Sequence, residues 1–222
     1  MSGWASSGWE LRDWELWDVV TDRAAAEAPG TGAPPAGVRM IGVAISIPDP
    51  YGAMLQGKRA SFGDPLAGAI PTHITLLPPT EVDGAMLDAI EAHLLDIARA
   101  ERPFHIRLHG SGTFRPVSPV VFVALDEGID DCERLQTKIL SGPLARPLEY
   151  PYHPHVTIAH HLPDRVMDRA YEELAGYTAG FEVWGFSLYE HGEDGVWRPQ
   201  RDFVFGVGGA GPRTEDDCPT AS

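Results

Sequence analysis

The 222-residue chain contains little cysteine and little positive charge, and both shortages restrict what it can be. Cys132 and Cys218 are its only cysteines, so a disulfide framework is not expected and a reducing cytoplasm is the natural setting. The 17 Lys and Arg residues stand against 32 Asp and Glu residues, for a formal net charge of −15. Because phosphate contacts normally require a basic surface, we expect no binding of long nucleic acid. A small phosphorylated ligand in a local pocket remains compatible with this charge.

A targeting signal and a membrane span are also missing from the sequence. The N-terminus lacks the basic start and following apolar run of a secretory signal. No apolar stretch approaches the roughly 20 residues that a transmembrane helix needs. We therefore expect a cytoplasmic protein without membrane contact. Its hydrophobic share of 43% is enough for one globular domain of ordinary size.

The two ends of the chain differ from its middle. Four of the six tryptophans fall within the first 17 residues, and apolar residues recur at helical spacing over about residues 9–28. This amphipathic helix could dock on the domain's own surface or form a partner or dimer contact. We expect residues 1–37 to form this helix and a Pro/Gly linker, residues 38–206 the folded domain, and residues 207–222 a disordered tail.

The middle of the chain alternates short apolar segments with segments of helical period. Residues 56–68 are expected to form a loop. Two segments that end the domain flank a Gly/Asp-containing turn, which predicts a hairpin. Strands are expected at 38–48, 72–79, 103–114, 119–126, 155–160, 181–191 and 196–206, and helices at 82–100, 129–140 and 164–174.

Two of these strands carry the same triplet, HIT at residues 73–75 and HVT at residues 155–157. A third match, HGS at residues 109–111, is followed by glycine and fits a strand end or turn. Within a strand, residues two apart face the same side, so each good triplet presents an imidazole and a hydroxyl together. Each is followed by a helix and two further strands, and their separation of 82 residues (155 − 73) suggests a duplication.

The paired triplets suit phosphodiester chemistry that needs no metal and no cofactor. One neutral histidine can take a proton from the attacking water, and a second, protonated histidine can give one to the leaving oxygen, because the ordinary pKa of histidine is about 6.5. Threonine hydroxyls can donate hydrogen bonds to the non-bridging oxygens. The candidate catalytic residues are therefore His73, Thr75, His155 and Thr157.

Three other interpretations compete with this one. The two motif histidines could be ordinary core residues, although their matched contexts disfavour it. Histidines at 153, 155, 160 and 161 could bind a metal, but Pro154 interrupts them and no carboxylate pattern completes a site. The His-x-His-x-His run of the histidine-triad nucleotide hydrolases would need a histidine where Thr157 stands.

Four segments together resemble the two-histidine phosphoesterase superfamily, in particular its 2′-5′ RNA ligase-like branch, over about residues 38–206. They are THITLLPP, HGSGTFRPVSPVVFVAL, YHPHVTIAHH and FSLYEHGEDGVWRPQRDFVFG. The resemblance implies a bilobal α+β fold, with two antiparallel-sheet lobes related by pseudo-twofold symmetry around a central cleft. It also implies hydrolysis of a 2′,3′-cyclic phosphodiester to a 2′-phosphomonoester, or a related reaction on a 2′-5′ linkage. His73 would be the proton donor and His155 the acceptor, with the threonines holding the phosphate.

The expected ligand is a small nucleotide or a short RNA end. A non-catalytic protein of the same fold that binds such a ligand is the alternative. Aromatic residues near the motifs could stack on a base, and arginines could add phosphate contacts, although core or rim packing explains the aromatics equally well. The aromatic candidates are Phe114, Tyr150 and Tyr152, and the arginine candidates are Arg115, Arg146, Arg198 and Arg201.

Overall fold

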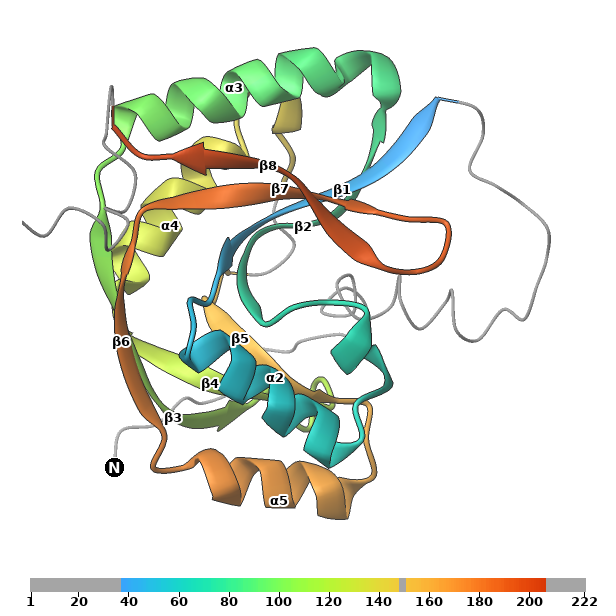
Figure 1. Cartoon of the computed structure of the whole chain (residues 1–222), viewed down its shortest axis with the longest axis vertical. Coiled ribbons are helices and arrows are strands. Elements are labelled where there is room, and N and C mark those ends of the chain that lie inside the picture. Colours follow the sequence, from blue (N-terminus) through green and yellow to red (C-terminus); the bar gives the residue numbers. More distant parts are fainter. Residues whose placement is uncertain (1–36, 148–150, 207–222) are drawn as a thin grey trace, which may run out of the picture.

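Two four-stranded antiparallel sheets form the framework of the protein (Figure 1). The computed structural model describes residues 37–147 and 151–206. The first sheet has the order β2-β1-β7-β8, with β1 Val38–Ser46, β2 His73–Asp83, β7 Gly185–His191 and β8 Trp197–Val204. The second sheet has the order β5-β4-β3-β6, with β3 Phe104–Thr113, β4 Val120–Glu127, β5 His155–His160 and β6 Thr178–Val183.

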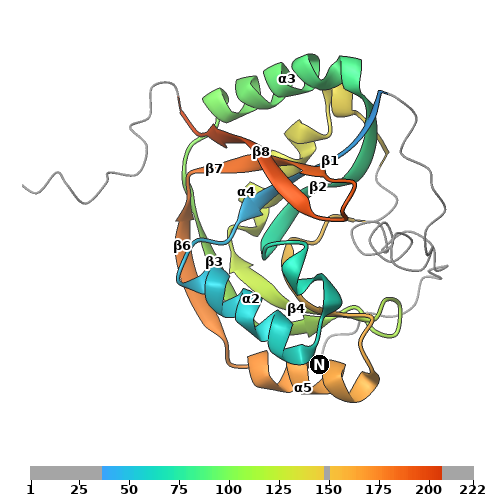
Figure 2. The ribbon, with the colours of Figure 1, turned by 45° about the vertical axis from the view of Figure 1, so that its right-hand side comes forward.

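Helices cover the two sheets from opposite ends of the molecule (Figures 1 and 2). The helix α3 lies along the outer side of the first lobe and α5 along that of the second, with α2 beside α5. An ion pair of 2.7 Å joins Lys58 on α2 to Glu173 on α5. The helices are α2 Tyr51–Phe62, α3 Leu87–Ala100, α4 Ile129–Ile139 and α5 Asp164–Leu174, and the short 3-10 turns are η1 Pro65–Gly68, η2 Gly84–Met86 and η3 Gly142–Leu144.

The two halves of the chain repeat the same order of elements. The first half runs β1-α2-β2-α3-β3, and the second runs β4-α4-β5-α5-β7 with β6 inserted before β7. In each half the first strand pairs with the motif strand, while the last strand crosses to the other sheet, β3 beside β4 and β7 beside β1. The helix of each half likewise contacts the motif strand of the other half, since α2 contacts β5 and α4 contacts β2. The bilobal α+β fold with pseudo-twofold symmetry is therefore confirmed.

A single large apolar core joins the two lobes. On α3, Ile90, Leu94 and Ile97 are buried at a spacing of three and four residues, so one face of the helix packs inward. Each strand in contact with this core also contributes buried side chains, and complete burial of such an aliphatic side chain stabilises the fold by about 1.5–3 kcal/mol. The core fixes the motif strands β2 and β5 relative to each other.

The expected loop at residues 56–68 is wrong, because α2 occupies most of it. Leu55, Arg59 and Phe62 recur at helical spacing and are buried together. The helix ends at Gly63, whose φ of 83° is the left-handed conformation that glycine adopts readily. Because Arg59 occupies one of the buried positions, the apolar spacing of this helix is incomplete in the sequence. The correspondence with α4 in the second half of the chain is the remaining indication of a helix here.

Two other boundaries differ from those expected. The strand β2 passes through Pro78 and Pro79 to Asp83, because β2 is an edge strand and its pairing with β1 shifts register between Leu77 and Thr80, which leaves both prolines out of the ladder. The helix α3 therefore begins at Leu87, whereas the sequence predicted a start at residue 82. The segment 181–191 is two strands, since the exposed Trp184 separates β6 in one sheet from β7 in the other.

The remaining strands and helices lie close to their expected positions. The amphipathic helix at 9–28, the linker and the C-terminal tail lie outside the described residues, and their roles stay predictions. Within the described ranges, no helix combines the length and apolarity needed to cross a membrane.

Candidate functional site

The two motif strands meet where the lobes join. Both β2 and β5 are edge strands, and they contact each other across the two sheets. Their triplets have matching neighbours: His73 and Thr75 pair with β1, whereas His155 and Thr157 pair with β4. All four motif side chains are partly exposed, while the residue between each pair is buried. The structure thus gives both triplets the same relation to their sheets.

The two imidazoles are held by the same local hydrogen bond. The Nδ1 atom of His73 lies 2.7 Å from the carbonyl oxygen of Pro71, and Nδ1 of His155 lies 2.7 Å from that of His153. A carbonyl oxygen only accepts, so Nδ1 carries the proton in each neutral ring. Each Nε2 is then left with a lone pair that can accept a proton. The carbonyl two residues upstream fixes the tautomer in both lobes.

Burial lowers the pKa of both motif histidines to about 4. The hydrogen bonds to the backbone carbonyls act in the opposite direction. The charges of Arg59 and His155 lower the pKa of His73 further, and that of His153 does the same for His155. Both rings are therefore neutral at pH 7 in the ligand-free protein. A bound phosphodiester anion would raise the pKa of each ring, because a nearby negative charge favours the protonated form.

Aromatic rings flank the histidine of the second lobe. The Phe114 ring lies edge-on to that of His155 with their centroids 5.0 Å apart, and the Phe122 ring is 5.1 Å from the same imidazole. A Cβ atom at Gly112 would lie 2.4 Å from the Phe122 ring, so glycine makes room for it. The predicted Phe114 is thus beside the motif, and Phe122 was missed because its role depends on strand pairing with Thr157.

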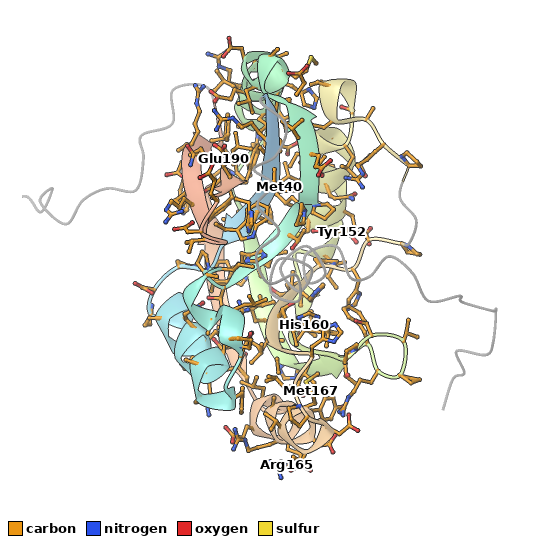
Figure 3. All side chains as sticks on the ribbon, turned by 90° about the vertical axis from the view of Figure 1, so that its right-hand side faces the viewer. Met40, Tyr152, His160, Arg165, Met167 and Glu190 are labelled. Atoms are coloured by element: carbon orange, nitrogen blue, oxygen red, sulfur yellow. The ribbon has the colours of Figure 1, made fainter. Side chains whose placement is uncertain are left out.

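Tyr152 connects the two motif strands. Its hydroxyl group donates a 2.7 Å hydrogen bond to the backbone carbonyl of Thr75, and its ring packs against the core. Burial raises the pKa of this phenol well above its usual value. Figure 3 shows Tyr152 near the junction of the lobes. These contacts make it a link between β2 and the segment before β5, while Tyr150 lies outside the described residues.

The candidate arginines are engaged with other side chains. Arg115 forms a 2.8 Å ion pair with Asp168 on α5. Arg198 is bound to Asp194 at 2.6 Å in the turn before β8, a strand that β1 and β7 separate from β2. Arg201 is bound to Glu91. The structure thus places Arg198 away from the motif strand of its own sheet.

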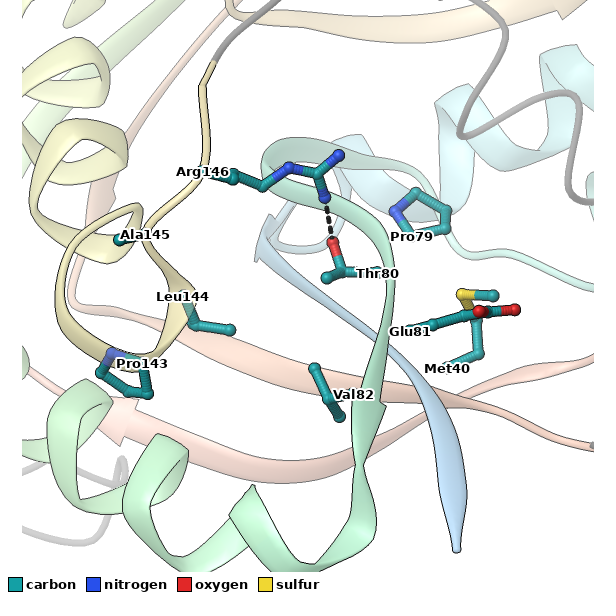
Figure 4. A pocket seen from close by; sticks show the side chains of 9 residues that line it. All are labelled: Met40, Pro79, Thr80, Glu81, Val82, Pro143, Leu144, Ala145 and Arg146. Atoms are coloured by element: carbon teal, nitrogen blue, oxygen red, sulfur yellow. Dashed lines mark hydrogen bonds between the residues drawn. The ribbon is translucent and has the colours of Figure 1, made fainter. Parts of the chain in front are cut away.

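Arg146 lines a pocket of about 530 Å³ farther along β2 (Figure 4). Its guanidinium donates a 2.7 Å hydrogen bond to the hydroxyl of Thr80. The pocket walls come from β1, the second half of β2 and the η3 segment, and they are Met40, Pro79, Thr80, Glu81, Val82, Pro143, Leu144, Ala145 and Arg146. None of the four motif residues lines this pocket.

The four neighbouring histidines of the second lobe divide into two pairs. The rings of His153 and His155 are 6.1 Å apart, and those of His160 and His161 are 4.0 Å apart. Burial lowers the pKa of His160 to about 3, and Figure 3 shows this residue between Tyr152 and α5. In the part of the chain that the structure describes, no three His, Cys, Asp or Glu side chains group as metal ligands would.

Comparison with known proteins identifies relatives of this arrangement. Residues 47–195, more than half of the chain, match the model of the family described as the 2′-5′ RNA ligase superfamily. A protein of Geobacillus sp. strain WCH70 named "Putative phosphoesterase" is 31% identical over 139 residues, which are 62% of this chain and 80% of the relative. A protein of Oceanobacillus iheyensis with the same name is 30% identical over 128 residues, 58% of this chain and 71% of the relative.

Solved structures share the fold at lower identity. The E. coli protein LigT in complex with 3′-AMP superposes with a TM-score of 0.55 and 17% identity, over 76% of this chain and 98% of that one. The protein TT0787 of Thermus thermophilus gives a TM-score of 0.55 and 24% identity, over 75% of this chain and 97% of that one. At these identities the likeness establishes the architecture alone.

Proposed function

Because the chain belongs to the 2′-5′ RNA ligase superfamily, we propose that it is a metal-independent phosphodiesterase acting on 2′,3′-cyclic or 2′-5′-linked nucleotide or RNA-end phosphodiesters. One observation carries this proposal. Two His-x-Thr triplets lie on adjoining edge strands, and each imidazole has its Nδ1 bound to the carbonyl two residues upstream. A chance pair of core histidines has no reason to share this geometry.

The proposed reaction uses His73 and His155 as an acid and base pair. A neutral imidazole takes a proton from water through Nε2 while the water oxygen attacks phosphorus. The protonated imidazole gives its Nε2 proton to the 3′ oxygen as the P–O3′ bond of the cyclic ester breaks. The products are a free 3′-hydroxyl and a 2′-phosphomonoester. Thr75 and Thr157, which share the faces of these rings by strand parity, would donate hydrogen bonds to the non-bridging oxygens.

The two histidines have different roles in this reaction. The family resemblance makes His73 the proton donor and His155 the acceptor. Burial and nearby positive charge lower the pKa of both rings to about 4, so these shifts give no reason to exchange the two roles. We therefore propose His73 as the acid and His155 as the base in hydrolysis.

A small nucleotide or a short RNA end is the proposed substrate. The net charge of −15 disfavours long nucleic acid, and 3′-AMP is the ligand named for the LigT structure of the same fold. The partly exposed ring of Phe114 beside His155 offers an apolar surface that suits a ribose or base, and the buried ring of Phe122 packs against it. Stacking by Tyr152 receives no support, since its ring packs on the core.

A panel of ligands separates this enzyme from the alternative, a binding protein of the same fold. The purified full chain is incubated with the four nucleoside 2′,3′-cyclic phosphates and with 2′-5′-linked dinucleotides, and products are resolved by chromatography and ³¹P NMR. The proposal expects turnover of at least one class, with a 2′-phosphate as the product from the cyclic esters. Saturable binding with the ligand unchanged over hours would favour the binding protein.

A further inference from the structure

The loop that leads into β2 is held by a glutamine of α2. The side-chain oxygen of Gln56 accepts a 2.8 Å hydrogen bond from the backbone N–H of Thr72, and its amide nitrogen donates at 3.2 Å to the carbonyl of Ile70. The same nitrogen contacts the carbonyl of Ala67. One amide group therefore binds the chain on both sides of Pro71, the residue whose carbonyl accepts the Nδ1 proton of His73.

A buried ion pair supports the same loop from the next turn of α2. Arg59 and Asp64 have only 4% and 1% of their side-chain surfaces exposed, and Nε and Nη2 of the arginine donate to one carboxylate oxygen at 2.9 and 2.8 Å. Its Nη1 donates to the Ile70 carbonyl at 3.3 Å. The nitrogens of Arg59 are thus directed to the protein, and a buried pair of this kind is costly to break.

We propose that Gln56, backed by Arg59, is a positioning residue that fixes the Pro71 carbonyl and thereby the tautomer and orientation of His73. The catalytic meaning of this proposal rests on the function proposed above. The second lobe reaches the same end differently, because the segment carrying the His153 carbonyl is tied to β2 by the hydroxyl of Tyr152. Gln56 therefore positions His73 alone, and the orientation of His155 depends on other contacts.

The charges around His73 fit a ring kept neutral until substrate arrives. The charges of Arg59 on α2 and His155 on β5 both lower its pKa beyond the effect of burial. Asp64 neutralises part of the arginine charge from the loop after α2. The helix α2 also contacts β5, where the charge of Arg59 lowers the pKa of His160. One helix thus holds the first motif and lies against the second.

The test compares Gln56→Met, which keeps the length of the side chain, with Gln136→Met as a matched control. Gln136 is 3% exposed and lies on α4, the helix that corresponds to α2 in the second half of the chain. Imidazole ¹⁵N NMR at pH 7 on the full chain reports the tautomer of each motif ring, and steady-state kinetics with a cyclic nucleotide report kcat and KM. Signals are assigned with His73→Ala and His155→Ala.

Gln56→Met should convert the His73 ring from one Nδ1–H tautomer to a mixture and leave His155 unchanged. Its kcat should fall about 10- to 100-fold with little change in KM, because the ring loses its alignment. The control should keep both tautomers and the wild-type kcat. A folded Gln56→Met variant with a single His73 tautomer and normal kcat overturns the proposal.

The design separates this proposal from the proposed function. If the wild type turns over no phosphodiester, the function fails, and the NMR comparison still decides whether Gln56 positions His73. If Gln56→Met does not fold, Gln56→Glu supplies a milder change, since a carboxylate oxygen can still accept from the Thr72 N–H but cannot donate to the Ile70 carbonyl. That variant should shift the His73 tautomer in the same direction, and an unchanged ring counts against the proposal.

Discussion

The pH dependence of kcat/KM should reveal the depressed pKa values of the motif histidines. Hydrolysis needs one neutral and one protonated imidazole, and kcat/KM follows the ionisation of the free enzyme. With both pKa values at about 4, the singly protonated form is scarce at pH 7 and increases as the pH falls. Lowering the pH from 7 to 5 should therefore raise kcat/KM about 100-fold, because each pH unit above the pKa costs a factor of about ten.

Histidines with ordinary pKa values would give the opposite sign. With both values at about 6.5, the singly protonated form is abundant at pH 7 and falls about sixfold by pH 5, where both rings are charged. The assay is initial rates on a 2′,3′-cyclic nucleotide well below KM in chelator, with circular dichroism confirming the fold at each pH. A decline in kcat/KM from pH 7 to pH 5 in the folded protein would refute the reasoning from burial.

Three further results are expected. Thr75→Val and Thr157→Val should each lower kcat by about 10- to 100-fold, less than loss of either histidine, because each removes one hydrogen bond to the phosphate oxygens. A substrate with a p-nitrophenolate leaving group needs little acid assistance, so it should rescue His73→Ala and not His155→Ala; rescue of the other variant would reverse the assigned roles. The pKa of His160, about 3 when folded, lies below its unfolded value, so its stabilising effect is complete above about pH 6.5 and is lost as the pH falls toward 3. In urea titrations, His160→Leu should reduce the loss of unfolding free energy between pH 7 and pH 5 by about 2 kcal/mol, and an unchanged difference would contradict the assigned cause.

Local periodicity predicts much of this fold because the core is built from regular elements. The helices α4 and α5 and the motif strand β5 lie where apolar spacing places them. The His-x-Thr spacing also brings both imidazoles to equivalent places in their sheets. The edge position of β2 and its register shift against β1 are tertiary properties, however, and together they explain how the strand continues through Pro78 and Pro79.

Two of the features that sequence reasoning missed depend on partners far along the chain, and the third depends on the folding of a nearby loop. Arg59 can be buried because its guanidinium forms an ion pair with Asp64 and a hydrogen bond to the Ile70 carbonyl in the loop before β2. A charged residue therefore occupies an inward-facing position of the helix. Tyr152 was a candidate for base stacking, but its hydroxyl bonds to Thr75, 77 residues away in the sequence. Phe122 reaches the site through strand pairing with Thr157. The contacts of Tyr152 and Phe122 have no signature in the residues around them.

We propose above that His73 and His155 form a metal-independent acid and base pair. The most direct measurement is the rate of 2′,3′-cyclic nucleotide hydrolysis by the wild type, His73→Ala and His155→Ala in excess chelator. We expect full wild-type activity under chelation and a loss of about 10²-fold or more in each variant, the usual scale for a missing acid or base. Activity that chelator abolishes and zinc restores, or folded variants that keep the wild-type rate, would contradict it.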